Sequence, residues 1–174
     1  PLITMGNLLG GMSLLGLLWW LMQREVESGD AQQGLVTYRP LAVLALVLVL
    51  LQIVLGGWSS ANYASANCPG LIECQGEILA AGNVAEAFNP RRTIELDANG
   101  TVIREDALGL LSMLHRLFAL MTAGYLAWLV RRVKHEPQLR GTVLALPLFS
   151  ISQIVVGVST IWFDMPLLLL TLHN

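Results

Sequence analysis

The sequence predicts an all-α integral membrane protein, in which a bundle of transmembrane helices carries one long loop. Hydrophobic residues make up 55% of the 174 positions and charged residues only 13%, with a mean hydropathy of +0.62. A soluble domain would need far more polar surface. The charges also lie in blocks between the apolar runs. A net charge of −2 gives no reason to expect nucleic acid, so the expected partners are lipid, a cofactor and other membrane subunits.

Four apolar runs are predicted to cross the bilayer, which requires about 20 residues each. Backbone groups inside lipid must bond internally, so these runs must be helices. They cover residues 1 to 22, 41 to 58, 107 to 130 and 141 to 162. A fifth run starts at Pro166 and ends at Asn174. Because this run is short and the chain begins with Pro1 and no signal-peptide pattern, we expect an internal piece of a longer protein with a truncated last helix.

The linkers between these runs indicate their orientation. Residues 131 to 140 contain four Lys or Arg against one Glu, whereas residues 59 to 107 contain three Arg against seven acidic residues. The positive-inside rule therefore predicts a cytoplasmic linker at 131 to 140 and an outward-facing loop at 59 to 106. The linker 23 to 40 should then also be cytoplasmic.

The outer loop contains a predicted hairpin and a cysteine pair. Two short β-prone runs flank Asn99-Gly100, a pair typical of a type I′ turn, so we expect a small β-hairpin there. Cys68 and Cys74 lie earlier in the loop, where an oxidising compartment favours a disulfide. The simple interpretation is a structural disulfide, and the alternative is a redox-active pair.

Two of the three histidines are predicted to lie at the same depth in the membrane. His135 belongs to the basic linker and is interpreted as a surface residue. His115 and His173 lie eight and seven residues into helices that enter from the outer face, which places each imidazole ~10 to 12 Å below that face. Matched histidines on two helices predict axial ligation of a b-type haem iron. The alternative is that each histidine only bonds a neighbouring helix.

Arg116 follows His115 directly inside an apolar run. A haem near the outer face must place two propionates, and an arginine beside an axial ligand can meet one of them. Simple extension of the side chain toward the interface is the alternative explanation. The predicted cofactor site therefore consists of His115, His173 and Arg116.

An internal repeat supports a duplicated unit. Gln52, Ile53, Val54 and Gly56 recur 101 residues later as Gln153, Ile154, Val155 and Gly157. Each copy precedes an outward-facing segment and then a histidine-bearing helix. The glycines would allow close approach of a macrocycle or a backbone. The glutamines are interpreted as packing hydrogen bonds between helices, with ligand contact as the alternative.

The segment "GGWSSANYASANCPGLIECQG", the "HR" at 115 and 116 and the terminal "PLLLLTLHN" resemble haem A synthase of the CtaA type, over the whole chain. In that family eight helices form two similar four-helix halves. The resemblance implies that residues 1 to 22 are the last helix of the first half, that 23 to 40 are a cytoplasmic linker and that 41 to 174 form most of the second half.

The resemblance also implies a function. It indicates a bacterial inner-membrane oxidoreductase that oxidises the C8 methyl group of haem O to the formyl group of haem A, for cytochrome oxidase assembly. Its second half holds haem b on axial ligands that map onto His115 and His173, and its outer-loop cysteines match Cys68 and Cys74. Haem O synthase, other oxidase assembly factors and a second copy of the chain are the protein partners left open.

Two departures from the family pattern limit what this stretch of chain can do. The family usually has a histidine at the position of Asn7, and its catalytic glutamate lies in an earlier helix that this sequence lacks. We therefore expect the parent to be an enzyme and the isolated piece to be inactive. Two other readings stay open, namely a non-catalytic haem-binding assembly factor and a quinone-coupled thiol oxidoreductase.

Overall fold

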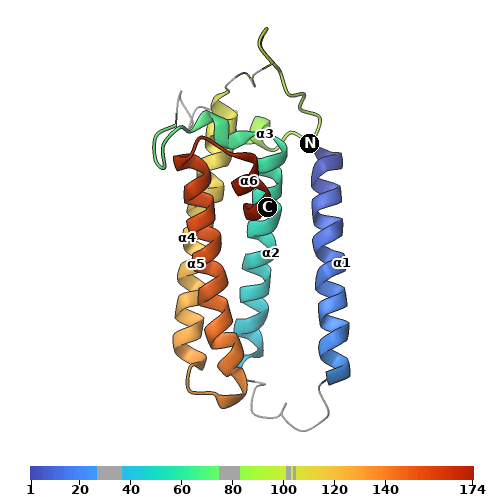
Figure 1. Ribbon diagram of the computed structural model, residues 1–174, viewed down its shortest axis with the longest axis vertical. Helices are drawn as coiled ribbons and strands as arrows, with labels where there is room; N and C mark the ends of the chain where they lie inside the picture. Colours follow the sequence, from blue (N-terminus) through green and yellow to red (C-terminus); the bar gives the residue numbers. More distant parts are fainter. Residues whose placement is uncertain (27–36, 75–82, 101–102, 104) are drawn as a thin grey trace.

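The fold is a group of four long helices, and the long loop between the second and the third of them lies at one end of the group (Figure 1). The computed structural model describes residues 1–26, 37–74, 83–100, 103 and 105–174, with only the backbone described at 22–26 and 138. The four helices are each long and apolar enough to cross a membrane, which confirms the four predicted spans. They are α1 (Leu2–Val26), α2 (Arg39–Ala61), α4 (Asp106–Val133) and α5 (Arg140–Trp162).

Helices α2, α4 and α5 form the centre of the bundle, whereas α1 packs on α2 at one side (Figure 1). The short helix α6 (Leu167–His173) turns back from the loop end of α5 and runs alongside it. Asp164 and Met165 make this reversal with positive φ angles, and the Met165 N–H donates to the Thr160 carbonyl at 2.7 Å. Pro166 then precedes α6, where its missing N–H costs nothing.

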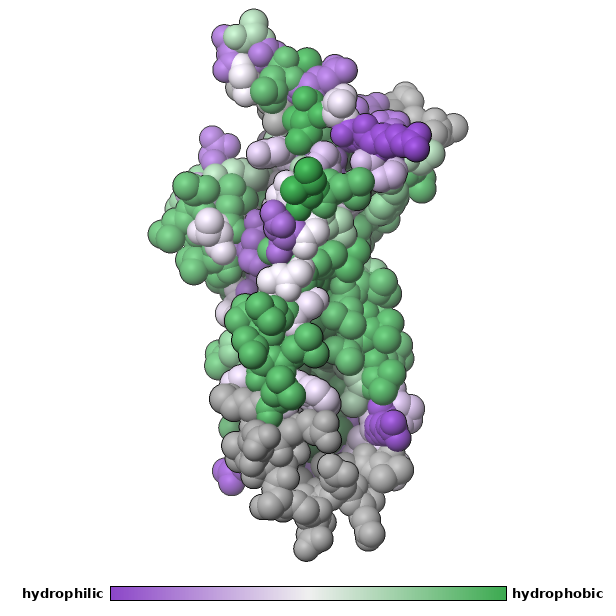
Figure 2. Space-filling view, turned by 90° about the vertical axis from the view of Figure 1, so that its right-hand side faces the viewer, coloured by the Kyte–Doolittle hydropathy of each residue, from purple (hydrophilic) through white to green (hydrophobic). Residues whose placement is uncertain are grey.

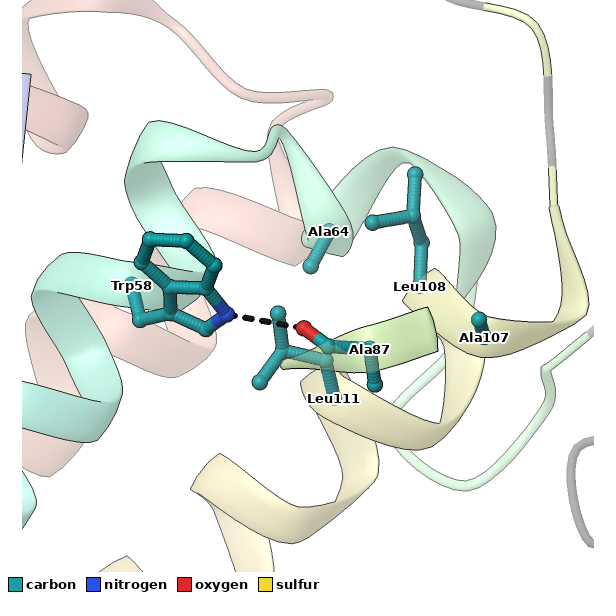
Figure 3. Packing of buried hydrophobic residues seen from close by; sticks show 6 residues of the cluster. All are labelled: Trp58, Ala64, Ala87, Ala107, Leu108 and Leu111. Atoms are coloured by element: carbon teal, nitrogen blue, oxygen red, sulfur yellow. Dashed lines mark hydrogen bonds between the residues drawn. The ribbon is translucent and has the colours of Figure 1, made fainter. Parts of the chain in front are cut away.

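The loop end of the bundle has its own apolar core. The short helices η2 (Ala64–Asn67) and α3 (Asn83–Ala87) pack against α4 there. The cluster shown in Figure 3 is formed by Trp58, Ala64, Ala87, Ala107, Leu108 and Leu111. The Trp58 indole N–H donates to the Ala87 carbonyl at 2.8 Å, so a buried ring finds its polar partner in α3. The long loop is thereby attached to the ends of α2 and α4.

A second cluster holds the opposite end together. It contains Ala45, Leu126, Leu129 and Val133 of α2 and α4. The Tyr125 hydroxyl donates to the Leu41 carbonyl at 3.0 Å, and the Tyr38 hydroxyl donates to Glu136 at 2.9 Å. The Glu136 carboxylate, which accepts this bond, raises the pKa of Tyr38. Helices α2 and α4 are therefore packed against each other at both ends.

The outward faces of the helices are apolar rather than polar. Figure 2 shows apolar side chains along the length of the bundle between more polar ends. Large side chains such as Leu14, Trp19, Leu148 and Phe149 are more than half exposed. Such faces are expected where lipid replaces water as the surrounding solvent.

The predicted β-hairpin is wrong. Within the described part of the loop there is no strand, and residues 101, 102 and 104 of the predicted hairpin lie outside the described residues. Beyond the turn itself, the Ile103 N–H donates to the Glu95 carbonyl at 2.9 Å. Gly100 has a φ of +78°, but Asn99 has no positive φ, so the pair does not form a type I′ turn. Instead, Asp97 caps the turn: its side chain accepts from the Asn99 N–H and its carbonyl accepts from the Gly100 N–H. Aspartate first and glycine fourth is the pattern of an ordinary type I turn.

Candidate functional site

The structure brings His115 of α4 and His173 of α6 together. Their ring centroids lie 6.2 Å apart, and the ring planes meet at 79°. The two residues are 58 positions apart in the chain, and each is half-buried. Their meeting follows from topology, because α4 leaves the outer loop and α6 returns from the same side.

The separation of the two rings suits a shared metal. An imidazole nitrogen binds a metal at about 2 Å, so two imidazoles on opposite sides of one ion have ring centroids roughly 6 Å apart. The angle between the ring planes imposes no further constraint, since each ring can rotate about its own bond to the metal. The pair therefore has the spacing of two axial ligands.

The donor set favours a metal that brings its own equatorial ligands. Across the described residues there is no group of three or more His, Cys, Asp or Glu side chains that could hold a bare ion. Two neutral imidazoles alone make an incomplete coordination sphere. A porphyrin supplies four nitrogens and needs only axial ligands from the protein. The residues present therefore fit a haem better than a free cation.

Two glycines lie against the two rings. A Cβ at Gly56 of α2 would stand 2.8 Å from Cε1 of His115, and a Cβ at Gly157 of α5 would stand 2.7 Å from Cε1 of His173. Real side chains essentially never approach so closely. A Cβ at either position would displace the ring, so each glycine lets a histidine pack on the first helix of its own repeat unit, and the repeat in the sequence appears in space as two equivalent glycine–histidine contacts.

The Nδ1 atoms of His115 and His173 have different surroundings. Nδ1 of His115 lies 3.1 Å from Nε2 of the Gln52 side chain. Nδ1 of His173, in contrast, is buried and has no hydrogen-bond partner among the described residues. The site is therefore duplicated in its glycines and histidines but not in its glutamines.

Arg116 holds the loop that contains the cysteines. Its Nη1 donates to the carbonyls of Gly70 and Leu71 at 2.6 and 2.8 Å, and its Nη2 donates to the carbonyl of Cys68 at 3.3 Å. A guanidinium has five N–H donors, so Nε and one hydrogen of Nη2 stay available. The loop contacts were not anticipated from the sequence, because an arginine inside an apolar run gives no sign of its partner.

Cys68 and Cys74 are joined by a disulfide, as the sequence predicted. The bridge packs on α4, with the two sulfur atoms 3.7 and 3.9 Å from the Gly109 carbonyl oxygen. Gly109 lies six residues before His115 on the same helix. The disulfide, Arg116 and the histidine pair therefore form one continuous structure at the loop end of α4.

Two cavities lie near this structure but not between the rings. One, of about 440 Å³, is almost entirely apolar and is lined by Leu2, Met5, Leu51, Val54, Leu55, Trp58, Phe88, Pro90 and Phe118. The other, of about 430 Å³, lies between the disulfide loop and the end of α5 and is lined in part by Leu71, Ile72 and Trp162. Neither includes a histidine, so we place the site by the chemistry of the pair and not by cavity volume.

The remaining predicted positions lie away from the pair. His135 is exposed in the linker between α4 and α5, as expected for a surface residue. Asn7 is exposed on α1. An additional contact was missed: the Asn174 side chain donates to the Ser60 hydroxyl at 2.9 Å and ties the end of α6 to α2. Ser60 lies one helical turn beyond Gly56, so this bond closes the bundle around the histidines.

Comparison with known proteins gives one family. The family model COX15-CtaA, described as cytochrome oxidase assembly protein, matches residues 1–174. The chain is 34% identical over 179 residues to the curated "Heme A synthase" of Shewanella oneidensis, a match that covers 100% of this chain and 53% of the relative. The chain thus spans about half the length of that relative. No solved structure matches it. The chain belongs to the COX15-CtaA family of cytochrome oxidase assembly proteins.

Proposed function

We propose that this chain is the haem-binding half of a membrane-bound haem A synthase, which oxidises the C8 methyl group of haem O to a formyl group for cytochrome oxidase assembly. The observation that carries the proposal is the 6.2 Å separation of the His115 and His173 rings, in a chain whose relative is a "Heme A synthase". In this proposal haem O is the substrate, haem b is the resident cofactor, and lipid surrounds the bundle.

His115 and His173 would be the axial ligands of the haem b iron. A haem b held in this way supplies a reversible one-electron couple, which suits electron transfer. His115 and His173 would hold this iron through two protein nitrogens and would leave the substrate no place on it. Gly56 and Gly157 keep the two rings seated on α2 and α5. We therefore assign this half to electron transfer and expect the substrate chemistry elsewhere in the parent protein.

Arg116 would serve both the loop and the cofactor. Three of its N–H groups hold the disulfide loop, and its remaining donors would meet a haem propionate at the outer edge of the site. Such a double role explains why a charged residue stands beside an axial ligand inside an apolar helix.

The remaining parts of the proposal concern the parent protein. Helix α1 would be the last helix of a first half, residues 23 to 40 a cytoplasmic linker, and residues 41 to 174 most of the second half. Asn7 would leave α1 without the iron ligand that the family usually has there. The catalytic residues would come from the first half, in the inner membrane of a bacterium, with loop 59 to 106 on the periplasmic side.

Pigment analysis of the full-length protein tests the proposal. We expect extraction to yield haem B together with haem O or haem A, and the reduced-minus-oxidised spectrum to show a six-coordinate b-type haem. His115→Ala and His173→Ala should each remove that signal, whereas His135→Ala, at an exposed position, should keep it.

Three results would overturn the proposal. One is a full-length protein that contains no haem B, or that retains an unchanged b-type spectrum in both histidine variants. Another is activity that survives His115→Ala but is abolished by Cys68→Ser, which would indicate a thiol oxidoreductase instead. The third is a protein that binds haem B but never forms haem A from haem O, which would indicate a non-catalytic assembly factor.

A further inference from the structure

We infer that Gln52 is the positioning residue that fixes the ring tautomer and orientation of His115 as an iron ligand, and that Gln153, its counterpart in the repeat, has no such role. This inference rests on the proposed function, because it concerns how the histidine presents its nitrogen to the haem.

The first observation is the position of the Gln52 amide. Gln52 lies on α2 one turn before Gly56, on the face that contacts α4, and its side chain is half-buried. Its Nε2 lies 3.1 Å from Nδ1 of His115 and 3.4 Å from the His115 carbonyl oxygen. The Gln52 amide therefore lies against both Nδ1 and the backbone of the same ligand residue.

The second observation is an unsatisfied oxygen on the same amide. Oε1 of Gln52 is buried and has no partner among the described residues. The two ends of a carboxamide have nearly the same shape, so a half-turn about χ3 exchanges them. After that half-turn Oε1 would face Nδ1 and accept its hydrogen. The exchange gives the buried oxygen a donor but gives up the 3.4 Å contact of Nε2 with the His115 carbonyl oxygen, so iron binding, and not the amide alone, has to select it.

Iron ligation requires the exchanged orientation. If Nε2 of Gln52 donates to Nδ1, the ring hydrogen of neutral His115 is on the histidine Nε2 and blocks the lone pair that would bind iron. If Oε1 accepts from Nδ1–H, the histidine Nε2 is free to bind. Histidines that ligate metals almost always donate their other N–H to an oxygen in this way. After the half-turn, the Gln52 side-chain oxygen would be the acceptor for Nδ1–H.

The third observation is the asymmetry of the repeat. Gln153 occupies the equivalent position on α5, but its side chain is exposed, and Nδ1 of His173 is without a partner in the described part of the chain. The two axial ligands are therefore inequivalent: one is oriented by a side-chain amide and the other is not. The same substitution at Gln52 and at Gln153 therefore gives a test variant and its matched control in one protein.

A hydrogen bond from Nδ1–H increases electron density on the ligating nitrogen and so favours ferric over ferrous iron. Loss of the acceptor at 52 should therefore raise the reduction potential of the haem. A purely structural role for Gln52 would change haem content without this directional change. The potential and the haem content together thus separate positioning from packing.

The test compares Gln52→Leu, Gln52→Glu and Gln153→Leu in the full-length, haem-loaded protein. We expect Gln52→Leu to lower haem affinity about 10-fold and to move the midpoint potential of the remaining haem upward. Gln52→Glu keeps an oxygen acceptor and should retain haem, with a potential at or below that of the wild type. Gln153→Leu should match the wild type in both measurements.

Two results would overturn the inference. The first is a change in Gln153→Leu as large as in Gln52→Leu. The second is a Gln52→Glu protein that loses its haem or has a raised potential, and this arm decides the matter even if Gln52→Leu does not fold. Failure of the proposed function is distinguishable, because the wild-type protein would then lack a haem with two axial histidines.

Discussion

Gly56 and Gly157 decide how close α2 and α5 come to the histidine rings. A methyl group at either position would stand within 2.8 Å of a ring carbon, so the ring or the helix must shift. We expect Gly56→Ala and Gly157→Ala each to lower haem B content about 10-fold, because a displaced ring no longer presents its nitrogen on the iron axis. Haem content and the reduced-minus-oxidised spectrum measure this effect.

The matched control for these variants is Gly124→Ala in α4. No heavy atom lies within 4 Å of a Cβ at that position, so the substitution should keep full haem content. In a helix it should even stabilise the protein by roughly 0.5–1 kcal/mol. Equal haem content in all three variants would show that the glycine–histidine contacts do not matter for binding.

The sequence could predict residues of the site but not all of their contacts. His115 and His173 could be paired because depth in a membrane follows from counting residues along helices that start at one face. Gly56 and Gly157 could be noticed because they recur at a fixed offset. The bond from Gln52 to His115 could not be assigned, since Gln52 and Gln153 are identical in the pattern. Which glutamine turns inward depends on helix rotation, which the repeat does not encode.

The disulfide loop is the element that connects the surface to the site. Arg116 holds this loop through three carbonyls. A hydrogen bond from a charged donor contributes about 1.5 kcal/mol. Loss of one such bond would therefore raise the population of molecules with an opened loop about 10-fold. We therefore expect Arg116→Gln to make the Cys68–Cys74 bond more easily reduced. The measurement is the rate of alkylation of the two cysteines during mild treatment with a soluble thiol.

Arg91→Gln is the control for this experiment. Arg91 lies in the same outer loop but is exposed, so its replacement should leave the alkylation rate unchanged. An Arg116→Gln protein with the wild-type rate would mean that the disulfide and the packing on Gly109 alone hold the loop. A similar acceleration in both variants would indicate a general charge effect on the attacking thiolate.

At the scale of elements, long-range regularities were predictable and local ones were not. The four spans were correct because about 20 apolar residues in lipid allow only a helix. The hairpin around Asn99-Gly100 was wrong because the side chain of Asp97, two residues earlier, caps a different turn. One side-chain hydrogen bond of Asp97 was thus enough to change the turn at Asn99-Gly100. No single hydrogen bond can change the helical structure of about 20 apolar residues in lipid.

Apart from α1, the bundle is built from two copies of one unit, each consisting of a glycine-bearing helix, a connecting segment and a histidine-bearing helix. In the first unit α2 and α4 meet at Gly56 and His115, and in the second α5 and α6 meet at Gly157 and His173. Because both histidine helices enter from the same side, the two units present their rings to each other. This arrangement requires the loop ends of both units to lie on one side of the membrane.

The orientation of the molecule in the membrane can be tested at its two exposed ends. Cys68 and Cys74 are bonded to each other and are the only cysteines among these 174 residues, so an introduced cysteine would be the only free thiol in this stretch of the protein. In intact spheroplasts a membrane-impermeant maleimide should label Asn99→Cys in the outer loop but not His135→Cys in the basic linker. The linker should react only after lysis, because moving its four Lys and Arg residues across the bilayer opposes the positive-inside rule.

The reverse pattern would place the histidine pair and the disulfide near the cytoplasm, where a disulfide is not expected to persist. Labelling of both positions in sealed spheroplasts would contradict a bundle that spans the membrane.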